Sequence, residues 1–180
     1  MFKTVVITLP RFFEGEAERI TSLLLEGKAD LVHIRKPGSK REDVERLLQA
    51  IPSELRPRLT LHDHFGLRDS VGGLHLNSRN ASAPEGWQGR LSRSCHSLEE
   101  VAQIKAQYDY VSLSPVFDSV SKQGYLSAFT AEQIAKARRE GIIDERVFAL
   151  GGIRFSMLEA VKAMGFGGAM ILGDAWRDLG

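Results

Sequence analysis

The sequence has one cysteine, almost no net charge and no long apolar run, and each lack excludes a class of protein. Cys95 cannot form an internal disulfide, which favours a reducing cytoplasm. The formal net charge of +1 provides no basic surface for nucleic acid or an anionic membrane. No apolar run is long enough to cross a bilayer, and Pro10 and Glu14 come too early for a signal peptide. The composition therefore predicts a cytoplasmic globular domain without nucleic-acid or membrane partners.

Short apolar or β-branched runs recur along the chain, and segments with helical periodicity lie between most of them. The expected strands are 4–9, 31–35, 59–61, 73–76, 91–94, 110–113, 146–150 and 168–172. The expected helices are 16–26, 41–50, 98–106, 130–140 and 156–163. "SLEE" at 97–100 and "TAEQ" at 130–133 are typical helix starts. Such alternation with short connections implies parallel strands and right-handed crossovers.

Eight strand units predict an α/β fold, a single closed (β/α)8 TIM-barrel domain over residues 1–180. The chain is shorter than the roughly 200 residues usual for the smallest barrels of this kind. We expect shortened helices after the third, fourth and eighth strands: 65–71 reads as a stub, 77–89 as irregular loop, and almost nothing follows 168–172. An open doubly wound sheet is the alternative, but no G-x-G-x-x-G follows the first strand.

Polar side chains cluster at the carboxyl ends of the predicted strands, where barrels of this kind carry their active sites. All five histidines fall at or near these ends: His33, His62, His64, His75 and His96. For His75 a hydrogen-bonded barrel residue is the simpler interpretation. A multi-histidine metal site lacks a dedicated ligand spacing such as H-x-x-x-H. Cys95 alternates with its polar neighbours along a strand, so we expect it to face the helices as a small core residue.

Loops after the last three predicted strands carry groups suited to binding an anion. Ser119, Ser121 and Lys122 follow the sixth strand, although such residues are also common in solvated turns. The glycines at Gly152 and Gly173 follow the seventh and eighth strands and let backbone amides approach a phosphate closely. A plain Gly-Gly turn is the alternative. Two glycine loops in matching places favour a phosphate site.

Seven motifs follow one another along the chain: "HIRKP" (33–37), "HDH" (62–64), "GLHLNS" (73–78), "SCHSLEE" (94–100), "DYVSLSPVFDSVSK" (109–122), "ALGGI" (149–153) and "GFGGAMILG" (165–173). In this order they resemble the motifs of thiamine phosphate synthase and its sister, the thiazole tautomerase, across nearly the whole chain. Any one match is weak, whereas seven in order are specific. The resemblance implies a TIM barrel that acts on small phosphorylated substrates in thiamine biosynthesis.

The synthase joins an aminopyrimidine (HMP) diphosphate to a thiazole phosphate and releases diphosphate, which makes it a transferase. The resemblance implies that Arg35, Ser94 and Lys122 are catalytic and hold the leaving diphosphate. It adds His33 and His62 to the pyrimidine diphosphate site. It places a Mg2+ cofactor on Asp63 and Asn80. A metal and fixed cations neutralise the departing polyanion, so the reaction requires no strong base.

The thiazole phosphate is the second substrate that the resemblance implies. Its binding residues would be Ser119, Val120, Ser121, Gly152, Leu172 and Gly173. The glycine loops would bind its phosphate through backbone amides. The loop after the sixth strand would thus contact both anions, and Lys122 and Arg35 would point into one cavity.

Several departures from the family pattern fall on the diphosphate half. His33 replaces a glutamine, Pro37 a lysine, His62 an asparagine and Asn80 the second metal aspartate, and the loop after the sixth strand has serines for threonines. The tautomerase branch in turn has a histidine where this chain has Pro115, and proline cannot transfer protons.

Two other functions therefore stay open beside the synthase. One is a thiazole-phosphate isomerase with His96 or His33 as its base. The other is a non-catalytic binder of thiazole or thiamine phosphate. Mg2+ dependence would separate the synthase from both. The sequence leaves a homodimer open.

Overall fold

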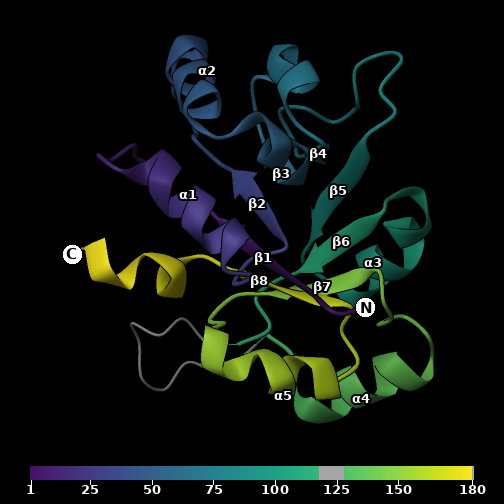
Figure 1. Cartoon of the computed structure of the whole chain (residues 1–180). Coiled ribbons are helices and arrows are strands. Elements are labelled where there is room, and N and C mark those ends of the chain that lie inside the picture. The colour runs from purple at the N-terminus through teal and green to yellow at the C-terminus, as the bar shows by residue number, and fades with distance from the viewer. Residues whose placement is uncertain (118–127, 180) are drawn as a thin grey trace. The chain divides into compact units, whose positions relative to one another are not determined.

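Eight parallel strands form a closed barrel in the computed structural model, which describes residues 1–117 and 128–179 (Figure 1). The strands follow one another around the barrel in chain order. They are β1 Lys3–Ile7, β2 Leu31–Ile34, β3 Leu59–Leu61, β4 Gly73–Leu76, β5 Arg90–Cys95, β6 Tyr110–Leu113, β7 Val147–Leu150 and β8 Gly168–Ile171. The predicted (β/α)8 fold is confirmed, and the predicted strand ends are right to within two residues.

Helical segments lie between the strands. The α-helices are α1 Glu16–Leu25, α2 Arg41–Ala50, α3 Leu98–Ile104, α4 Ala131–Arg139 and α5 Leu158–Ala163. The 3-10 segments are η1 Ser53–Arg58, η2 Phe65–Ser70, η3 Lys105–Gln107, η4 Phe155–Met157 and η5 Gly173–Leu179. The shortened helix predicted after the eighth strand is the 3-10 segment η5, in which Ala175 and Trp176 are buried. The stub after β3 is η2, and 77–89 is irregular, as predicted.

The chain divides into two compact units, residues 5–91 and residues 1–4 with 92–180. In the first unit, α1 and α2 lie side by side (Figure 1). Their predicted apolar faces are buried: Ile20, Leu23, Leu24, Val44, Leu47 and Leu48. Each such side chain contributes roughly 1.5–3 kcal/mol by leaving water. The prediction of a single domain stays a prediction.

In the second unit, side-chain caps fix the starts of two helices. Ser97 Oγ accepts a hydrogen bond from Glu100 N at 3.1 Å. Thr130 Oγ1 accepts from Gln133 N at 3.1 Å, and Gln133 Oε1 accepts from Thr130 N at 2.8 Å, which completes a capping box. Both helix starts were predicted from the sequence. Cys95, at the end of β5, is fully buried.

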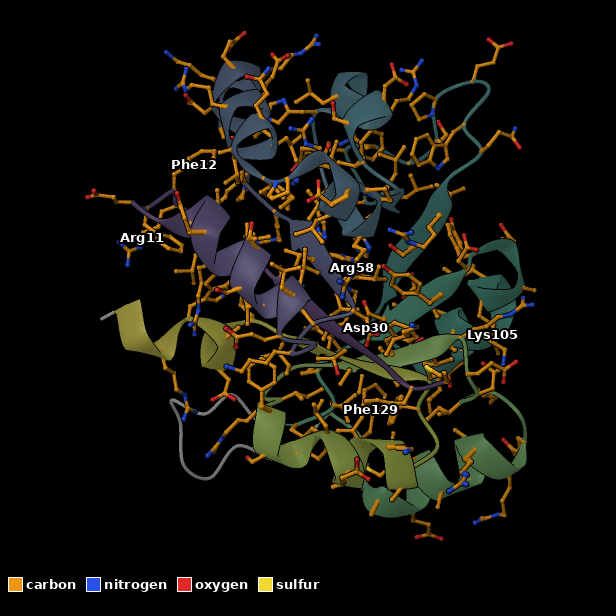
Figure 2. The ribbon with its side chains drawn as sticks, viewed as in Figure 1. Arg11, Phe12, Asp30, Arg58, Lys105 and Phe129 are labelled. Atoms are coloured by element: carbon orange, nitrogen blue, oxygen red, sulfur yellow. The ribbon has the colours of Figure 1, made fainter. Side chains whose placement is uncertain are left out.

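Arg58, at the end of η1, binds three backbone carbonyls of the first unit. Its guanidinium donates to Leu24 O at 2.9 Å, Ala29 O at 2.6 Å and Asp30 O at 2.9 Å (Figure 2). It thereby connects the end of α1 to the start of β2. No helix in the part of the chain that the structure describes is long and apolar enough to span a membrane.

Candidate functional site

Three histidines from neighbouring strands come together inside the first unit. His33 lies on β2, His75 on β4, and His62 directly after β3. His33 Nδ1 and His62 Nε2 share a hydrogen bond of 2.8 Å, and the rings of His62 and His75 stack with centroids 4.2 Å apart. All three are buried, with His62 the most exposed at 8%. The sequence predicts His75 as a hydrogen-bonded barrel residue. The structure places it in a group of three, which we call the histidine cluster (His33, His62 and His75).

Burial lowers the pKa of every histidine in this cluster. It is the largest cause for each, and nearby positive charge adds to it, from Arg90 for His33 and from Arg35 for His62 and His75. The pKa of His75 falls to about 4, and those of His33 and His62 lie well below 6.5. At neutral pH the three imidazoles are therefore uncharged. Each then has one N–H donor and one nitrogen lone pair.

Asp63 and Asn80, the predicted metal residues, lie side by side. Asn80 Nδ2 donates to Asp63 Oδ1 at 3.2 Å. Asn77 shapes the loop after β4, because its Oδ1 accepts from Arg79 N at 2.9 Å and from Asn80 N at 3.0 Å. The expected convergence is thus present, whereas the role of the two residues as metal ligands stays a prediction.

Arg79 is the residue of this site that the sequence analysis missed. Its Nη2 lies 3.0 Å from Asp63 Oδ1 and 3.1 Å from Asp63 Oδ2. The Arg79 side chain is 63% exposed and that of Asp63 17%. The signal was in the sequence, since Asn77 two positions earlier is typical of a tight Asx turn that directs the following residues.

Asp63 and Asn80 would fit Mg2+ after the Asn80 amide turns its Oδ1, in place of the Nδ2 that now faces Asp63, toward the ion. A carboxylate and an amide oxygen are ligands that Mg2+ accepts, and it commonly takes one or two carboxylates plus substrate phosphates and water. The guanidinium on Asp63 shows that a cation is already favoured at this carboxylate. Metal and Arg79 would therefore compete for the same oxygens.

Two consecutive cations after β2 have opposite environments. Arg35 is exposed, and its backbone is fixed by Thr8, whose Oγ1 accepts from Arg35 N at 2.9 Å. Lys36 is buried and forms a 2.5 Å ion pair with Glu16. Its Nζ also lies 4.6 Å from the ring centroid of Phe12, in the segment before α1 (Figure 2). Arg35 is therefore free to meet solvent or ligand, whereas Lys36 is structural.

In the second unit, Ser94 lies on β5 opposite Ser112 of β6, and Ser112 Oγ donates to Ser94 Oγ at 3.2 Å. His96, just after β5, is exposed and places Nδ1 3.3 Å from both the carbonyl and the hydroxyl oxygen of Ser114. His96 follows β5 and Ser114 follows β6, and these two strands are neighbours. Donation from Nδ1 to the Ser114 carbonyl would leave Nε2 of His96 as a lone-pair acceptor.

The glycine loops after β7 and β8 are joined. Phe155 N donates to Asp174 Oδ2 at 2.8 Å, which connects the loop after β7 to η5. Gly152 has φ +63°, and a Cβ on Gly173 would meet nothing within 4 Å. Leu172 beside it is 38% exposed. The predicted phosphate loops are thus close together and leave open space at Gly173.

Gly151 must be a glycine because of its backbone conformation and because Pro115 lies close to it. Its φ is +103°, and a Cβ there would lie 2.9 Å from Pro115 Cα. Its carbonyl accepts from Phe117 N at 3.3 Å. The chain after β6 therefore packs directly on this glycine.

Four of the predicted site residues lie outside the described part of the chain. They are Ser119, Val120, Ser121 and Lys122. The expectation that Lys122 shares a cavity with Arg35 therefore stays a prediction.

The closed barrel with polar groups after its strands places the chain in the class of TIM-barrel enzymes. A family model described as thiamine monophosphate synthase matches residues 4–173, and the chain belongs to this family. The resemblance found in the sequence motifs is thereby confirmed.

Relatives and solved structures agree with this family. The thiamine-phosphate synthase of Halalkalibacterium halodurans is 29% identical over 176 residues, covering 91% of this chain and 82% of the relative. That of Parasynechococcus marenigrum is 31% identical and covers 87% and 47%. A thiamine phosphate pyrophosphorylase from Bacteroides thetaiotaomicron is 43% identical with a TM-score of 0.88, covering 98% and 85%. The counterpart from Pyrococcus furiosus, at 19% identity and a TM-score of 0.70 over 99% and 95%, shows the fold alone.

Proposed function

We propose that this chain joins an aminopyrimidine diphosphate to a thiazole phosphate and releases diphosphate. The family match over residues 4–173 carries the proposal. In this reaction the carbon–oxygen bond at the pyrimidine methylene breaks and its electron pair leaves with diphosphate. The thiazole nitrogen then supplies the pair for the new carbon–nitrogen bond. The thiamine phosphate product and diphosphate account for all atoms of the two substrates.

The leaving diphosphate needs positive charge. Arg35 and a metal ion held by Asp63 and Asn80 would supply it. Arg35 is exposed after β2 with its backbone held by Thr8, which suits a cation that binds a phosphate oxygen. Asp63 and Asn80 would hold Mg2+, which when bound would neutralise diphosphate oxygens. Ser94 and Lys122 keep their proposed roles as further diphosphate ligands.

The pyrimidine and the thiazole phosphate would be recognised by neutral groups. His33 and His62 are uncharged, so they can donate and accept hydrogen bonds without adding charge beside the aminopyrimidine. The thiazole phosphate would bind to backbone amides at Gly152 and Gly173, with Leu172 beside them. Ser119, Val120 and Ser121 keep their proposed place on the thiazole side. We further expect the reaction to occur in the cytoplasm.

A thiazole-phosphate isomerase is the second candidate, favoured by the geometry of His96. The contacts of Nδ1 with Ser114 would orient the ring and leave Nε2 to accept a proton. Such an enzyme would convert the thiazole substrate alone and would release no diphosphate.

A product assay separates these functions. The purified full chain is incubated with both substrates, with and without Mg2+, and thiamine phosphate and diphosphate are measured by chromatography. We expect both products in equal amounts, and only with Mg2+. Arg35→Gln should lower kcat/KM by about 100-fold or more, as for other groups that stabilise developing negative charge. Arg139→Gln, at an exposed position of α4, serves as the matched control and should keep full activity.

Two results would contradict the proposal. Conversion of the thiazole substrate without diphosphate release would show the isomerase. Binding of thiazole phosphate without any turnover would show a binder.

A further inference from the structure

We propose that His33, His62 and His75 together bind one divalent transition-metal ion, Zn2+ above all, inside the first unit. Each histidine offers one ring nitrogen, and these three nitrogens lie within 4.8 Å of one another. The donors differ from those proposed for Mg2+, which are oxygens. The proposal goes beyond the synthase reaction, although it shares His33 and His62 with the proposed pyrimidine site.

The geometry needs only small changes to accept the ion. Zn–N bonds of about 2.0–2.1 Å in a tetrahedral site place two ligand nitrogens about 3.3 Å apart. His33 Nδ1 and His62 Nε2 are now 2.8 Å apart, so this pair must open by about 0.5 Å. The widest pair must close by no more than about 1.5 Å. Side-chain rotation can supply such movements.

The backbone already holds the three side chains in a fixed relation. β2 pairs with β3 and β3 with β4, each in parallel register, so His33 and His75 lie on the two strands beside β3 and His62 follows β3 directly. Asn77 Nδ2 donates to His62 O at 2.7 Å and fixes the chain where β3 has ended. The ligands therefore come from rigid elements, which favours binding over a site formed by loops.

The ligand type selects the metal. Imidazole nitrogen suits Zn2+, Cu2+ and Ni2+, whereas Mg2+ and Ca2+ prefer oxygen. The hydrogen bond between His33 Nδ1 and His62 Nε2 contains one proton, which must move to the other nitrogen of its ring before both atoms can bind the ion. Three histidines leave a fourth position for water or another ligand.

Nearby charge sets the expected affinity. Arg35 and Arg90 act on these rings with positive charge, which opposes a dication as it opposes a proton. We therefore expect weaker binding than in structural zinc sites, with a dissociation constant near 1 µM, about 8 kcal/mol of binding free energy.

Zinc titration of the chelator-treated full chain tests the site. Calorimetry at pH 7.5 should show one Zn2+ per chain, bound with a dissociation constant below about 10 µM. X-ray absorption of the complex should show three nitrogen ligands at about 2.0 Å. His75→Gln should weaken Zn2+ binding at least tenfold. His64→Asn is the matched control, because His64 lies outside the cluster at φ +56°, a conformation that asparagine tolerates.

Absence of Zn2+ binding by the folded parent chain would overturn the proposal and leave a purely hydrogen-bonded cluster. Equal weakening by His75→Gln and His64→Asn would also overturn it, since the ion would then bind elsewhere. The parent measurement decides the matter even if His75→Gln does not fold.

Discussion

His62 and Asp63 are consecutive in the chain and yet experience opposite electrostatic conditions. Successive residues at the end of a strand point to different sides, so His62 turns into the histidine cluster while Asp63 stays half-buried and meets Arg79. Burial lowers the pKa of the His62 imidazole, whereas the Asp63 carboxylate forms an ion pair with the Arg79 guanidinium. Two consecutive residues therefore offer different metal-ligand atoms: imidazole nitrogens at His62 and carboxylate oxygens at Asp63.

The low pKa of His75 predicts that the protein loses stability in acid. The imidazole is neutral in the folded chain down to about pH 4, whereas the unfolded chain binds a proton below pH 6.5. The unfolded state is thus favoured increasingly as pH falls from 6.5 to 4, by about 3 kcal/mol from His75 alone. Urea unfolding at several pH values measures this slope. His75→Gln should flatten it, and an unchanged slope in that variant would contradict the assignment.

The ion pair between Arg79 and Asp63 predicts that Arg79→Gln strengthens Mg2+ binding. Removing the competing cation leaves the Asp63 carboxylate to the metal, and because Arg79 is largely exposed we expect only a few-fold gain. Asn80→Asp should add about tenfold more by supplying a second carboxylate. Mn2+ as a paramagnetic stand-in, followed by water proton relaxation, measures both effects. Ser78→Ala in the same loop is the control, and equal affinities in all variants would place the metal elsewhere.

At the scale of elements, short segments are held by buried polar groups as well as by apolar faces. Glu16 begins α1, and Lys36 follows β2, so their ion pair joins the two elements. Lys36 Nζ also donates to Leu9 O at 2.9 Å and Arg11 O at 2.7 Å, which fixes the segment between β1 and α1. One ammonium group thus orders three parts of the chain.

Lys36→Met should therefore destabilise the fold by about 3–5 kcal/mol, because Glu16 would keep a buried charge without its partner. Lys36→Met combined with Glu16→Leu should recover most of the loss, since an apolar pair leaves no charge behind. Lys28→Met is the matched control, because its ion pair with Glu26 lies at the surface and should contribute little to stability. Urea unfolding measures all three. A double variant no better than the single one would refute the explanation.

The two glycine loops should respond oppositely to substitution. Gly151→Ala should destabilise the protein by about 1–3 kcal/mol, because its φ is positive and the new Cβ would meet Pro115. Gly173→Val should leave thermal stability nearly unchanged, since its Cβ enters open space. If that space holds the phosphate, Gly173→Val should instead weaken thiazole phosphate binding at least tenfold by calorimetry. Unchanged binding would move the phosphate away from η5.

At the scale of the whole molecule, the barrel could be predicted because each strand and helix has its own periodicity in the sequence. The burial of Trp176 in η5 could not, because it depends on contacts made only after folding. Asp63 and Asn80 could be placed together, since both follow neighbouring strands. A multi-histidine site was considered and disfavoured because no segment has a dedicated ligand spacing. Linear spacings apply only to one segment, whereas the histidine cluster combines residues of β2 and β4 with His62 directly after β3.

Arg58 makes the end of α1 and the start of β2 open together. Since one guanidinium binds the carbonyls of Leu24, Ala29 and Asp30, local unfolding of either segment must break bonds to the other. Amide protons in these two segments should then exchange with solvent through one shared opening, at one common free energy. A lysine, with a single point charge in place of a planar fork, would divide this region into parts that open separately.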